Sequence, residues 1–342
     1  MSKVAIKDEI SATSIIPTQL LISSTFICCQ MLVLLISIFL ATVLLSLLLT
    51  YYSKEVLLNA GRVLPDLHKP IQVKVPSPGG VAISVSFIVG ALVYMQIFGY
   101  SHKILLACYI GAICSFIGLI DDIIPIGPLG KIVVTGVAFS PISLSSVSIV
   151  GLPHIIPRCL YPVGSILLGI FVVNASNMVA GFNGLEAGLS SIVNIALFII
   201  AMQLHGVVFA FPHLILLASC IGFLYYNFYP AKIFPGNCGT FAMGGFTAAF
   251  AMVNGLHIPL FLLFIPHLFD FVVKFRVSFK VKEYGHAEHG EGGIIYPPRY
   301  KSLISILLKR FRLTELKLVL SLWLIELFLS VIVVFYTTKV LF

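Results

Sequence analysis

The sequence predicts an all-α, polytopic membrane protein with about ten transmembrane helices, on two observations. Of the 342 residues, 59% are hydrophobic and 10% are charged, whereas soluble domains carry roughly 25% charged residues. The charged residues also lie mostly between long apolar runs, which approach the ~20 residues that a membrane-spanning helix needs. The net charge of +8 does not indicate nucleic acid as a partner, because the basic residues form no clustered face.

The apolar runs, taken in chain order, define the spans. The first run, residues 10–53, contains no Asp, Glu, Lys or Arg and is too long for one crossing of ~20 residues. We therefore assign residues 1–27 to an N-terminal extracytoplasmic segment and residues 28–342 to the membrane domain. No small-residue cleavage site follows a short apolar core, so we expect no removable signal peptide. The ten spans are predicted at residues 28–52, 80–98, 104–120, 132–150, 160–174, 189–204, 211–228, 241–254, 258–273 and 316–336.

Basic residues indicate the orientation of these spans. Ten crossings put both termini on one side of the membrane. The loops on the other side hold or border sixteen of the 21 lysines and arginines. Because basic residues are enriched in cytoplasmic loops, we predict that these loops are cytoplasmic and that both termini are extracytoplasmic. The predicted cytoplasmic loops are residues 53–79, 121–131, 175–188, 229–240 and 274–315.

Acidic, amide and histidine side chains gather in the same five loops, which predicts a site at the cytoplasmic face of an integral membrane protein. An alternative is a membrane transporter of a nucleotide sugar or a lipid-linked sugar. Transporters usually place ionisable groups near the middle of the bilayer. Here Glu326 is the one such candidate well inside a span, and we interpret it as a bundle-facing glutamate paired with a polar neighbour.

The strongest local signal is an acid pair at the end of the third span. Asp121 and Asp122 are followed by a turn that contains Gly and Pro, and Lys131 then begins the next apolar run. Adjacent carboxylates beside lipid are unfavourable unless a cation neutralises them. A divalent metal, an anionic substrate bound through that metal, and Lys131 would each relieve this cost. The alternative is a pair of acids that simply face water at a helix end.

Two other loops are rich in amides and glycine. Residues 174–188, NASNMVAGFNGLEAG, contain Asn177, Asn183 and Glu186, and residues 236–240, GNCGT, contain Asn237. Amide oxygens can ligate a hard cation or hydrogen-bond a polar ring without adding charge. Helix caps and tight turns would use the same residue types, but the density of asparagine exceeds what capping needs.

The first cytoplasmic loop contains Asp66 and Lys69, followed by Gly79 and Gly80 at the start of the second span. Backbone amides at the start of a helix can hold phosphate oxygens. An ordinary turn into a helix would explain the glycine pair equally well.

The last cytoplasmic loop contains His286, His289 and Arg299. The two histidines could bind zinc, but the glycines around them favour a mobile loop that grips a substrate. Residues 301–313, KSLISILLKRFRL, are predicted to form a helix that lies on the membrane surface, with its basic residues near anionic headgroups.

Together these stretches resemble the polyprenyl-phosphate N-acetylhexosamine-1-phosphate transferases. The resemblance covers residues 62–299 and depends on DLHKP followed by VPSPGG, the Asp-Asp pair followed by Pro, Gly and Lys, the Asn-rich stretch, and FPGNCGTF, in that order. The GFNGLEAG motif more closely resembles the archaeal and eukaryotic branch, which uses UDP-N-acetylglucosamine and dolichyl phosphate. The bacterial cell-wall branch usually has Asp where Asn183 stands.

The resemblance implies a reaction and its partners. The phosphate of a polyprenyl carrier attacks the β-phosphorus of UDP-N-acetylglucosamine, UMP leaves, and a lipid diphosphate sugar remains in the bilayer. The implied cofactor is Mg²⁺, with Mn²⁺ as an alternative. The sequence leaves both a monomer and a homodimer as alternatives. Phosphoryl transfer depends mainly on positioning and charge neutralisation, which suits a site of acids, amides and lysines.

The resemblance also implies residue roles. Asp121 and Asp122 match an acid pair linked to the metal and the lipid phosphate, and Lys131 matches a lysine that contacts the diphosphate. Asn177 and Asn237 match magnesium ligands, although the second is usually Asp, so this chain would have one negative charge fewer there. Asn183 matches a residue near the uracil. The remaining predicted substrate-binding residues are Asp66, Lys69, Glu186, His286, His289 and Arg299.

Overall fold

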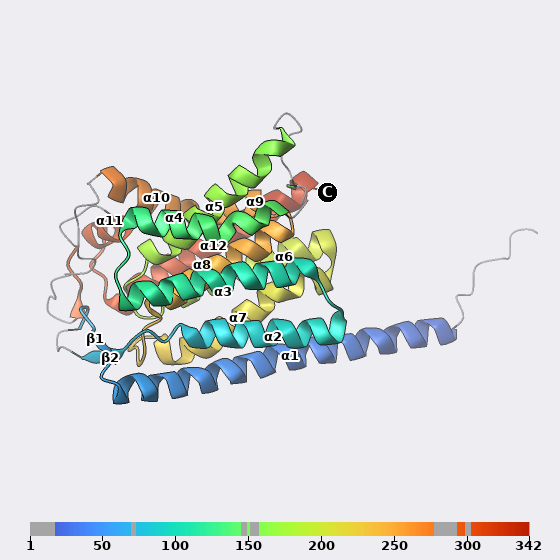
Figure 1. Cartoon of the computed structure of the whole chain (residues 1–342), viewed down its shortest axis with the longest axis horizontal. Coiled ribbons are helices and arrows are strands. Elements are labelled where there is room, and N and C mark those ends of the chain that lie inside the picture. The colour runs from blue at the N-terminus through green and yellow to red at the C-terminus, as the bar shows by residue number, and fades with distance from the viewer. Residues whose placement is uncertain are drawn as a thin grey trace, which may run out of the picture.

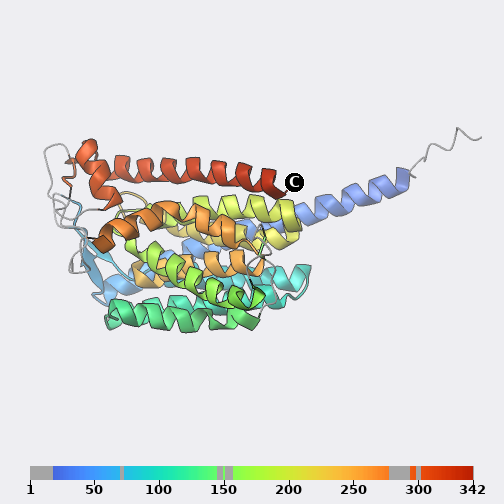
Figure 2. The same cartoon turned by 90° about the horizontal axis from the view of Figure 1, so that it is seen from above.

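The structure is a bundle of helices with one short β-hairpin, as expected for an all-α membrane protein. It is a computed structural model and describes residues 18–69, 73–144, 149–150, 157–276, 293–297 and 302–341. Most helices run along a common direction (Figures 1 and 2). The elements are α1 Thr18–Asn59, β1 Val63–Pro65, β2 Lys74–Pro76, α2 Val81–Phe98, α3 His102–Ile123, α4 Pro128–Phe139, η1 Ser140–Leu144, η2 Arg158–Leu160, α5 Tyr161–Met178, α6 Leu185–His205, α7 Val207–Asn227, α8 Gly236–Val253, α9 His257–Leu263, α10 Ile265–Arg276, α11 Leu303–Arg310 and α12 Glu315–Leu341.

Seven of the described helices are long and apolar enough to cross a membrane: α1, α2, α3, α5, α6, α7 and α12. The predicted fourth span is wrong in its bounds, because α4 begins at Pro128 and its α-helical part ends at Phe139. Proline suits the first position of a helix, but Pro141 cannot continue one, because its ring clashes with the carbonyl four residues earlier. Twelve α-helical residues reach only about 18 Å, less than the ~30 Å hydrocarbon layer.

The predicted ninth span is divided into two helices. α9 ends at Leu263 and α10 begins at Ile265, with Phe264 between them. Pro266 accounts for the break, because it lacks an amide proton and disfavours helical backbone at the residue before it. The structure therefore interrupts, at one residue, a stretch that hydropathy alone describes as continuous.

α1 is longer than the predicted first span and projects beyond the bundle, at the end away from β1 and β2 (Figures 1 and 2). Its 42 residues correspond to about 63 Å of helix. Its described side chains include exposed Leu32, Leu40, Leu44 and Leu48. An apolar helix surface of this kind is expected where the neighbour is lipid.

The enclosed helix of the bundle is α8, in which every residue from Cys238 to Val253 is buried. α3 packs along it at short range, because glycines leave room for the approach. A Cβ atom added to Gly118 would lie 2.3 Å from the backbone oxygen of Asn237, which no real structure tolerates without movement. This contact places the last turn of α3, with Asp121 and Asp122, against the first turn of α8.

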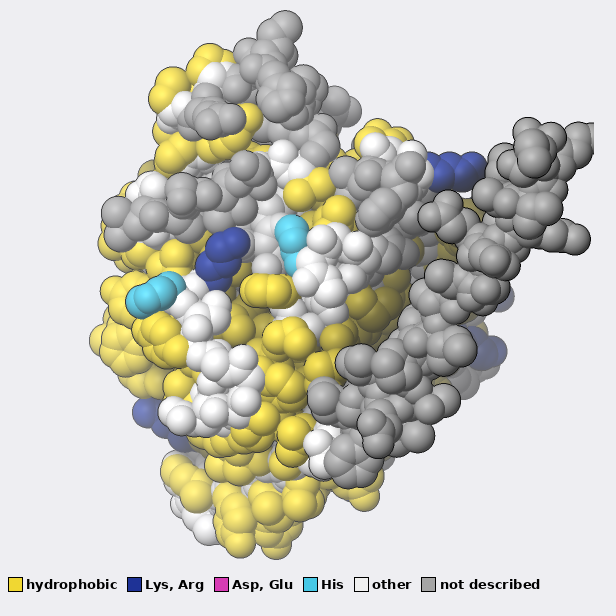
Figure 3. Space-filling view, turned by 90° about the vertical axis from the view of Figure 1, so that its right-hand side faces the viewer, with side chains coloured by type: hydrophobic (Ala, Val, Ile, Leu, Met, Phe, Trp, Pro, Cys, Tyr) yellow, Lys and Arg dark blue, Asp and Glu magenta, His cyan; other side chains and the backbone are white. Residues whose placement is uncertain are grey.

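The two ends of the bundle differ in chemistry. Figure 3 shows the end away from β1 and β2: hydrophobic side chains cover most of the described surface, with a few basic and histidine side chains and no acidic one in view. Asp66 and the acid pair lie at the other end, after β1 and at the end of α3. The described residues therefore support a site at one end of the bundle.

A second, smaller hydrophobic cluster joins α11 and α12 to the α5–α6 loop. Phe182 and Leu185 pack there with Ile304 and Leu308 of α11 and with residues of α12. The predicted helix within residues 301–313 is present as α11, and one face of it packs on the protein. Its other face exposes Ile306 beside basic residues, so contact with the membrane surface stays a prediction.

Candidate functional site

A cavity of about 290 Å³ lies at the β1–β2 end of the bundle. The turn after β1, the α5–α6 loop, the α7–α8 loop and the ends of α3, α5 and α8 form its wall. This wall includes five residues predicted from the sequence, from segments far apart in the chain: Asp66, Asp122, Asn177, Glu186 and Asn237.

Asp122 binds the N-terminus of α8. Its Oδ1 accepts a hydrogen bond from the backbone N–H of Asn237 at 2.8 Å, and its Oδ2 accepts one from the N–H of Cys238 at 2.9 Å. The first amides of a helix have no partner within the helix, and its dipole favours a negative charge there. Two backbone donors therefore hold the carboxyl group of the second acid at the cavity wall.

Asp121 points elsewhere, since successive helix residues diverge by about 100°. Its Oδ2 pairs with Nζ of Lys131 at 2.6 Å, and its Oδ1 accepts a hydrogen bond from the N–H of Ile126 at 2.7 Å. The Lys131 ammonium also lies 6.0 Å from the ring centre of Phe241. Neither Asp121 nor Lys131 lines the cavity, so the predicted catalytic trio is divided between the wall and a pair beside it.

Asn177 and Asn237 meet through Thr240. The Thr240 hydroxyl donates to Oδ1 of Asn177 at 2.9 Å and lies 3.2 Å from the backbone oxygen of Asn237. All three residues line the cavity, together with Asp122. One carboxylate and two carboxamides thus line the same cavity. Oxygen atoms of Asp122 and Asn177 already accept hydrogen bonds from α8, and a site for a hard cation here stays a prediction.

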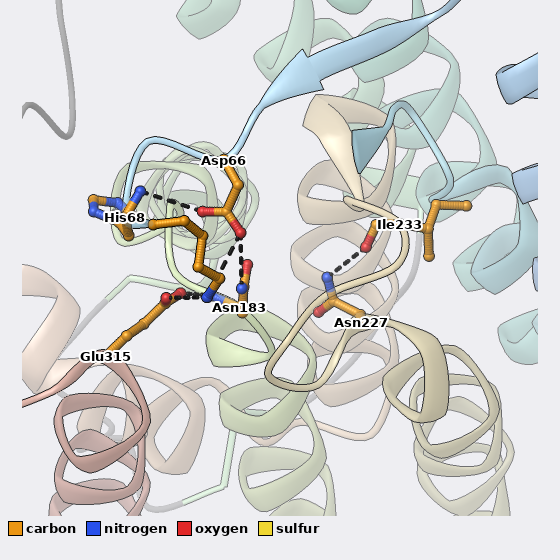
Figure 4. A network of polar contacts seen from close by, with 7 residues as sticks. Asp66, His68, Asn183, Asn227, Ile233 and Glu315 are labelled. Carbon is orange, nitrogen blue, oxygen red and sulfur yellow. Dashed lines mark hydrogen bonds and ion pairs between the residues drawn. The ribbon is translucent and has the colours of Figure 1, made fainter. Parts of the chain in front are cut away.

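Behind another part of the wall, Lys69, Asn183 and Glu315 form a closed set of contacts with Asp66, which we name the acid–lysine ring (Figure 4). Nδ2 of Asn183 donates to Oδ2 of Asp66 at 3.0 Å. Nζ of Lys69 lies 2.6 Å from Oε2 of Glu315 and 3.7 Å from Oδ2 of Asp66. The N–H of Asn183 donates to Oε1 of Glu315 at 2.8 Å.

Only Asp66 among the ring residues lines the cavity. Asn183 is 2% exposed, and its amide group is used by Asp66, so it lies behind the wall rather than on it. The ammonium of Lys69 lies 3.6 Å from the ring centre of Tyr229, which helps to hold it out of water. The structure therefore places these predicted substrate-binding residues in one network, with Asp66 as the member that faces the cavity.

Glu186 and an aromatic pair complete this side of the wall. Oε1 of Glu186 accepts a hydrogen bond from the N–H of Gly181 at 2.6 Å, which closes the α5–α6 loop. The rings of His68 and Phe182 are stacked with centres 4.2 Å apart, and both residues line the cavity. This side of the wall therefore combines a stacked aromatic pair with two carboxylates.

The phosphate-binding hypothesis for Gly79 and Gly80 is wrong. The N–H of Gly79 donates to the oxygen of Phe234 at 2.8 Å, and that of Gly80 donates to the oxygen of Pro235 at 2.9 Å. A Cβ atom at Gly80 would lie 2.1 Å from the Cα of Gly239. The glycines serve close packing of the first loop on the α7–α8 loop, and their amides are already used.

Three predicted residues, His286, His289 and Arg299, lie outside the described residues. Sequence reasoning missed Glu315 and Thr240, which link the predicted residues to one another. Glu315 had a weak signal, because an acid in the first turn of an apolar helix is common for reasons of the helix dipole alone. Thr240 had none beyond its place in the GNCGT stretch.

The electrostatic character of the wall is acidic. Asp66, Asp122 and Glu186 contribute carboxylates, and none of the described lining residues is Lys or Arg. Lys69 and Lys131 stand behind the wall and are each paired with an acid. An anionic ligand would therefore need an additional cation, whereas an uncharged group that donates hydrogen bonds would be accepted directly.

Comparison with known proteins identifies relatives over most of the chain. The profile of glycosyl transferase family 4 matches residues 102–255. A relative from Sulfolobus acidocaldarius is 29% identical over 294 residues, and one from Saccharolobus solfataricus is 30% identical over 290 residues. Each alignment covers 80% of this chain and 87% of the relative, and both proteins are provisionally named UDP-N-acetylglucosamine–dolichyl-phosphate N-acetylglucosaminephosphotransferase.

A third relative, from Methanocaldococcus jannaschii, is provisionally named a glycosyltransferase. It is 32% identical over 274 residues, which cover 78% of this chain and 85% of the relative. These alignments are longer than the profile region, so the similarity is not confined to residues 102–255. This chain is therefore a member of glycosyl transferase family 4.

Proposed function

We propose that this protein transfers N-acetylglucosamine 1-phosphate from UDP-N-acetylglucosamine to a polyprenyl phosphate of the dolichyl type. One observation carries the proposal: Asp122, Asn177 and Asn237, from three separate motifs, meet on one cavity at the end of a membrane bundle. The names of two archaeal relatives supply the pair of substrates.

The bond changes balance without a redox partner. An oxygen of the lipid phosphate forms a bond to the β-phosphorus of the nucleotide sugar. The bond from that phosphorus to the bridging oxygen breaks, and UMP leaves with the electron pair. A phosphate monoester has a second pKa near ~6, so the attacking phosphate is largely a dianion at neutral pH. We therefore assign Asp121 and Asp122 to orientation and electrostatics rather than to proton removal.

The acidic wall requires a cation if a nucleotide diphosphate is to bind. We propose Mg²⁺, with Mn²⁺ as an alternative, held by oxygen atoms of Asp122, Asn177 and Asn237. Mg²⁺ is usually bound by one or two carboxylates together with substrate phosphates and water, and this donor set fits that preference. A bound ion would neutralise the charge of the diphosphate. Among the described residues no three His, Cys, Asp or Glu side chains gather around one point, and the proposed set contains only one carboxylate.

Lys131 supplies a second positive charge near the acid pair. Its ion pair with Asp121 keeps the ammonium beside Asp122 without occupying the cavity. We propose that a diphosphate attracts Lys131 away from Asp121, because a doubly charged phosphate competes well with one carboxylate. His286, His289 and Arg299 are proposed to contact the sugar and the diphosphate from the last loop.

The orientation of the bundle follows from the distribution of basic residues. We propose that the β1–β2 end faces the cytoplasm and that both termini face the other side, because sixteen of the 21 lysines and arginines lie in or beside the predicted cytoplasmic loops. The nucleotide sugar would then enter from the cytoplasm.

The test is a transfer assay with purified protein reconstituted into lipid vesicles. UDP-[14C]N-acetylglucosamine, dolichyl phosphate and MgCl₂ are supplied, and UMP release and lipid-soluble label are measured. Equal amounts of UMP and labelled lipid are expected. Label that only crosses a vesicle wall, with no UMP, would indicate transport and overturn the proposal. Omission of the metal and a panel of UDP-sugars test the cofactor and the sugar in the same assay.

A further inference from the structure

Glu315 is a buried carboxylate that lies outside the predicted motifs and has no predicted role. It is the first residue of α12 and is 3% exposed. Each of its oxygens has a different partner: Oε2 pairs with Lys69 at 2.6 Å, and Oε1 accepts the N–H of Asn183 at 2.8 Å. A buried charge with two short contacts at the start of an apolar helix calls for an explanation beyond helix capping.

The helix that carries Glu315 is fixed relative to the cavity. Nε1 of Trp323 donates to the backbone oxygen of Leu185 at 3.3 Å, and a Cβ atom on Gly188 would lie 1.9 Å from the Trp323 ring. Leu318 and Leu322 are buried in the cluster that contains Phe182. Glu315 therefore stands on a rigid support behind the cavity wall.

The acid–lysine ring contains two carboxylates and one ammonium, so its two acids share Lys69 (Figure 4). Lys69 lies 1.1 Å nearer to Glu315 than to Asp66, from 2.6 and 3.7 Å. Because Glu315 holds the ammonium, Oδ2 of Asp66 stays bonded to the amide of Asn183. Removal of the charge on Glu315 would leave Asp66 as the nearest partner of Lys69 and pull that carboxylate off the wall.

We propose that Glu315 is a positioning residue that holds Lys69 away from Asp66 and so keeps Asp66 on the cavity wall to receive the uncharged, hydrogen-bond-donating part of the nucleotide sugar. This inference rests on the proposed function. The ring has a net negative charge, which repels phosphates, while Asp66 lies beside the stacked rings of His68 and Phe182. This part of the wall suits a nucleoside or a sugar, and the Asp122 part suits the phosphates.

The test compares Glu315→Gln with wild type in the transfer assay. Glutamine keeps an acceptor for the N–H of Asn183 but loses the charge that holds Lys69. We expect the KM for UDP-N-acetylglucosamine to rise about tenfold, the effect of one charge-assisted hydrogen bond. We expect kcat to change less than about threefold and the KM for dolichyl phosphate to stay constant, since the lost contact concerns nucleotide-sugar binding.

Two further variants separate positioning from general stability. Lys69→Met in the Glu315→Gln background removes the side chain that pulls Asp66, so part of the lost affinity should return. Glu326→Gln removes another buried carboxylate of α12, far from the ring, and should leave the KM unchanged. Three results would each overturn the inference. The first is a double variant whose loss of affinity is the sum of the two single losses. The others are an unchanged KM in Glu315→Gln and an equal rise of the KM in Glu326→Gln.

If Glu315→Gln does not fold, Glu315→Asp replaces it. Its carboxylate is one methylene shorter and lies farther from Lys69, so we expect a smaller rise in the KM for UDP-N-acetylglucosamine. The failure of the proposed function is a different result, namely no UMP from the wild-type protein. The inference fails if the wild-type protein is active and the substitution of Glu315 leaves the KM for UDP-N-acetylglucosamine unchanged.

Discussion

Two acids on the cavity wall are held by different means. Asp122 is bound by two backbone amides at the start of α8. Asp66 is bound mainly by side chains, through Asn183 and Lys69, and by the N–H of His68 at 3.2 Å. Backbone donors are present whatever the side chains are, whereas a side-chain network changes with each member.

The difference indicates where each acid is sensitive. Asp122 depends on how closely α3 approaches α8, and therefore on small residues such as Gly118. Asp66 depends on the balance of charge in the ring. The position of Asp122, in the part of the wall that we assign to phosphates, thus depends on helix packing. The position of Asp66, in the part that we assign to nucleoside or sugar, depends on four polar side chains.

The largest effect is expected for Asp122→Asn. The Nδ2 group of asparagine would face a backbone N–H of α8, and the negative charge near the proposed cation would be lost. We expect UMP release to fall by about 10²–10³. The protein should still fold, as judged by size-exclusion chromatography and thermal unfolding beside Glu326→Gln. Activity above a tenth of wild type would contradict the role of Asp122.

The next effect concerns Asn183, where two substitutions distinguish charge from lost contact. Asn183→Ala removes the donor to Asp66 but keeps the backbone bond to Glu315, and the nucleotide-sugar KM should rise about tenfold. Asn183→Asp adds a third carboxylate to a ring with one lysine, and we expect a loss of about thirtyfold or more in kcat/KM. Equal effects of the two variants would show that ring charge is unimportant.

A smaller effect is expected for Gly118→Ala, which tests the packing that places Asp122. The new methyl group would meet the backbone oxygen of Asn237 at 2.3 Å, and overpacking of this kind costs about 1–3 kcal/mol. Thermal unfolding should occur at lower temperature and transfer should slow several-fold. Gly164→Ala is the matched control, because no atom lies within 4 Å of its added Cβ. If both alanine variants behave alike, α3–α8 contact does not position the acid.

The smallest effect is expected for Asn237→Asp. Its side chain lies on the cavity wall in the first turn of α8, where a carboxylate is favoured by about 0.3–1 kcal/mol. We expect transfer activity to persist and the Mg²⁺ concentration for half-maximal rate to fall several-fold, since a carboxylate binds the ion better than an amide. A titration of both forms with MgCl₂ measures this. A well-folded but inactive variant would argue against Asn237 as a ligand.

Much of the site was predictable because the residue types are unusual for their surroundings. Asp121, Asp122 and the asparagines at the end of α5 and in the α5–α6 loop are conspicuous at the ends of apolar runs, since polar groups are unfavourable there unless they have a partner. The same contrast could not distinguish Asp121 from Asp122, although one pairs with Lys131 and the other binds α8. The prediction for Gly79 and Gly80 was wrong because close helix packing and phosphate binding both favour glycine.

The sequence by itself determined the class of protein and the end of the bundle at which polar chemistry gathers, because hydrocarbon excludes unpaired polar groups from long stretches of the chain. The tertiary structure decided the partners. It brought Glu315 to Lys69 across 246 positions of the chain and placed Asn183 behind Asp66. It also broke the predicted ninth span at Phe264. Contacts of this kind depend on how closely helices approach and which way each side chain points, and neither quantity is encoded in hydropathy.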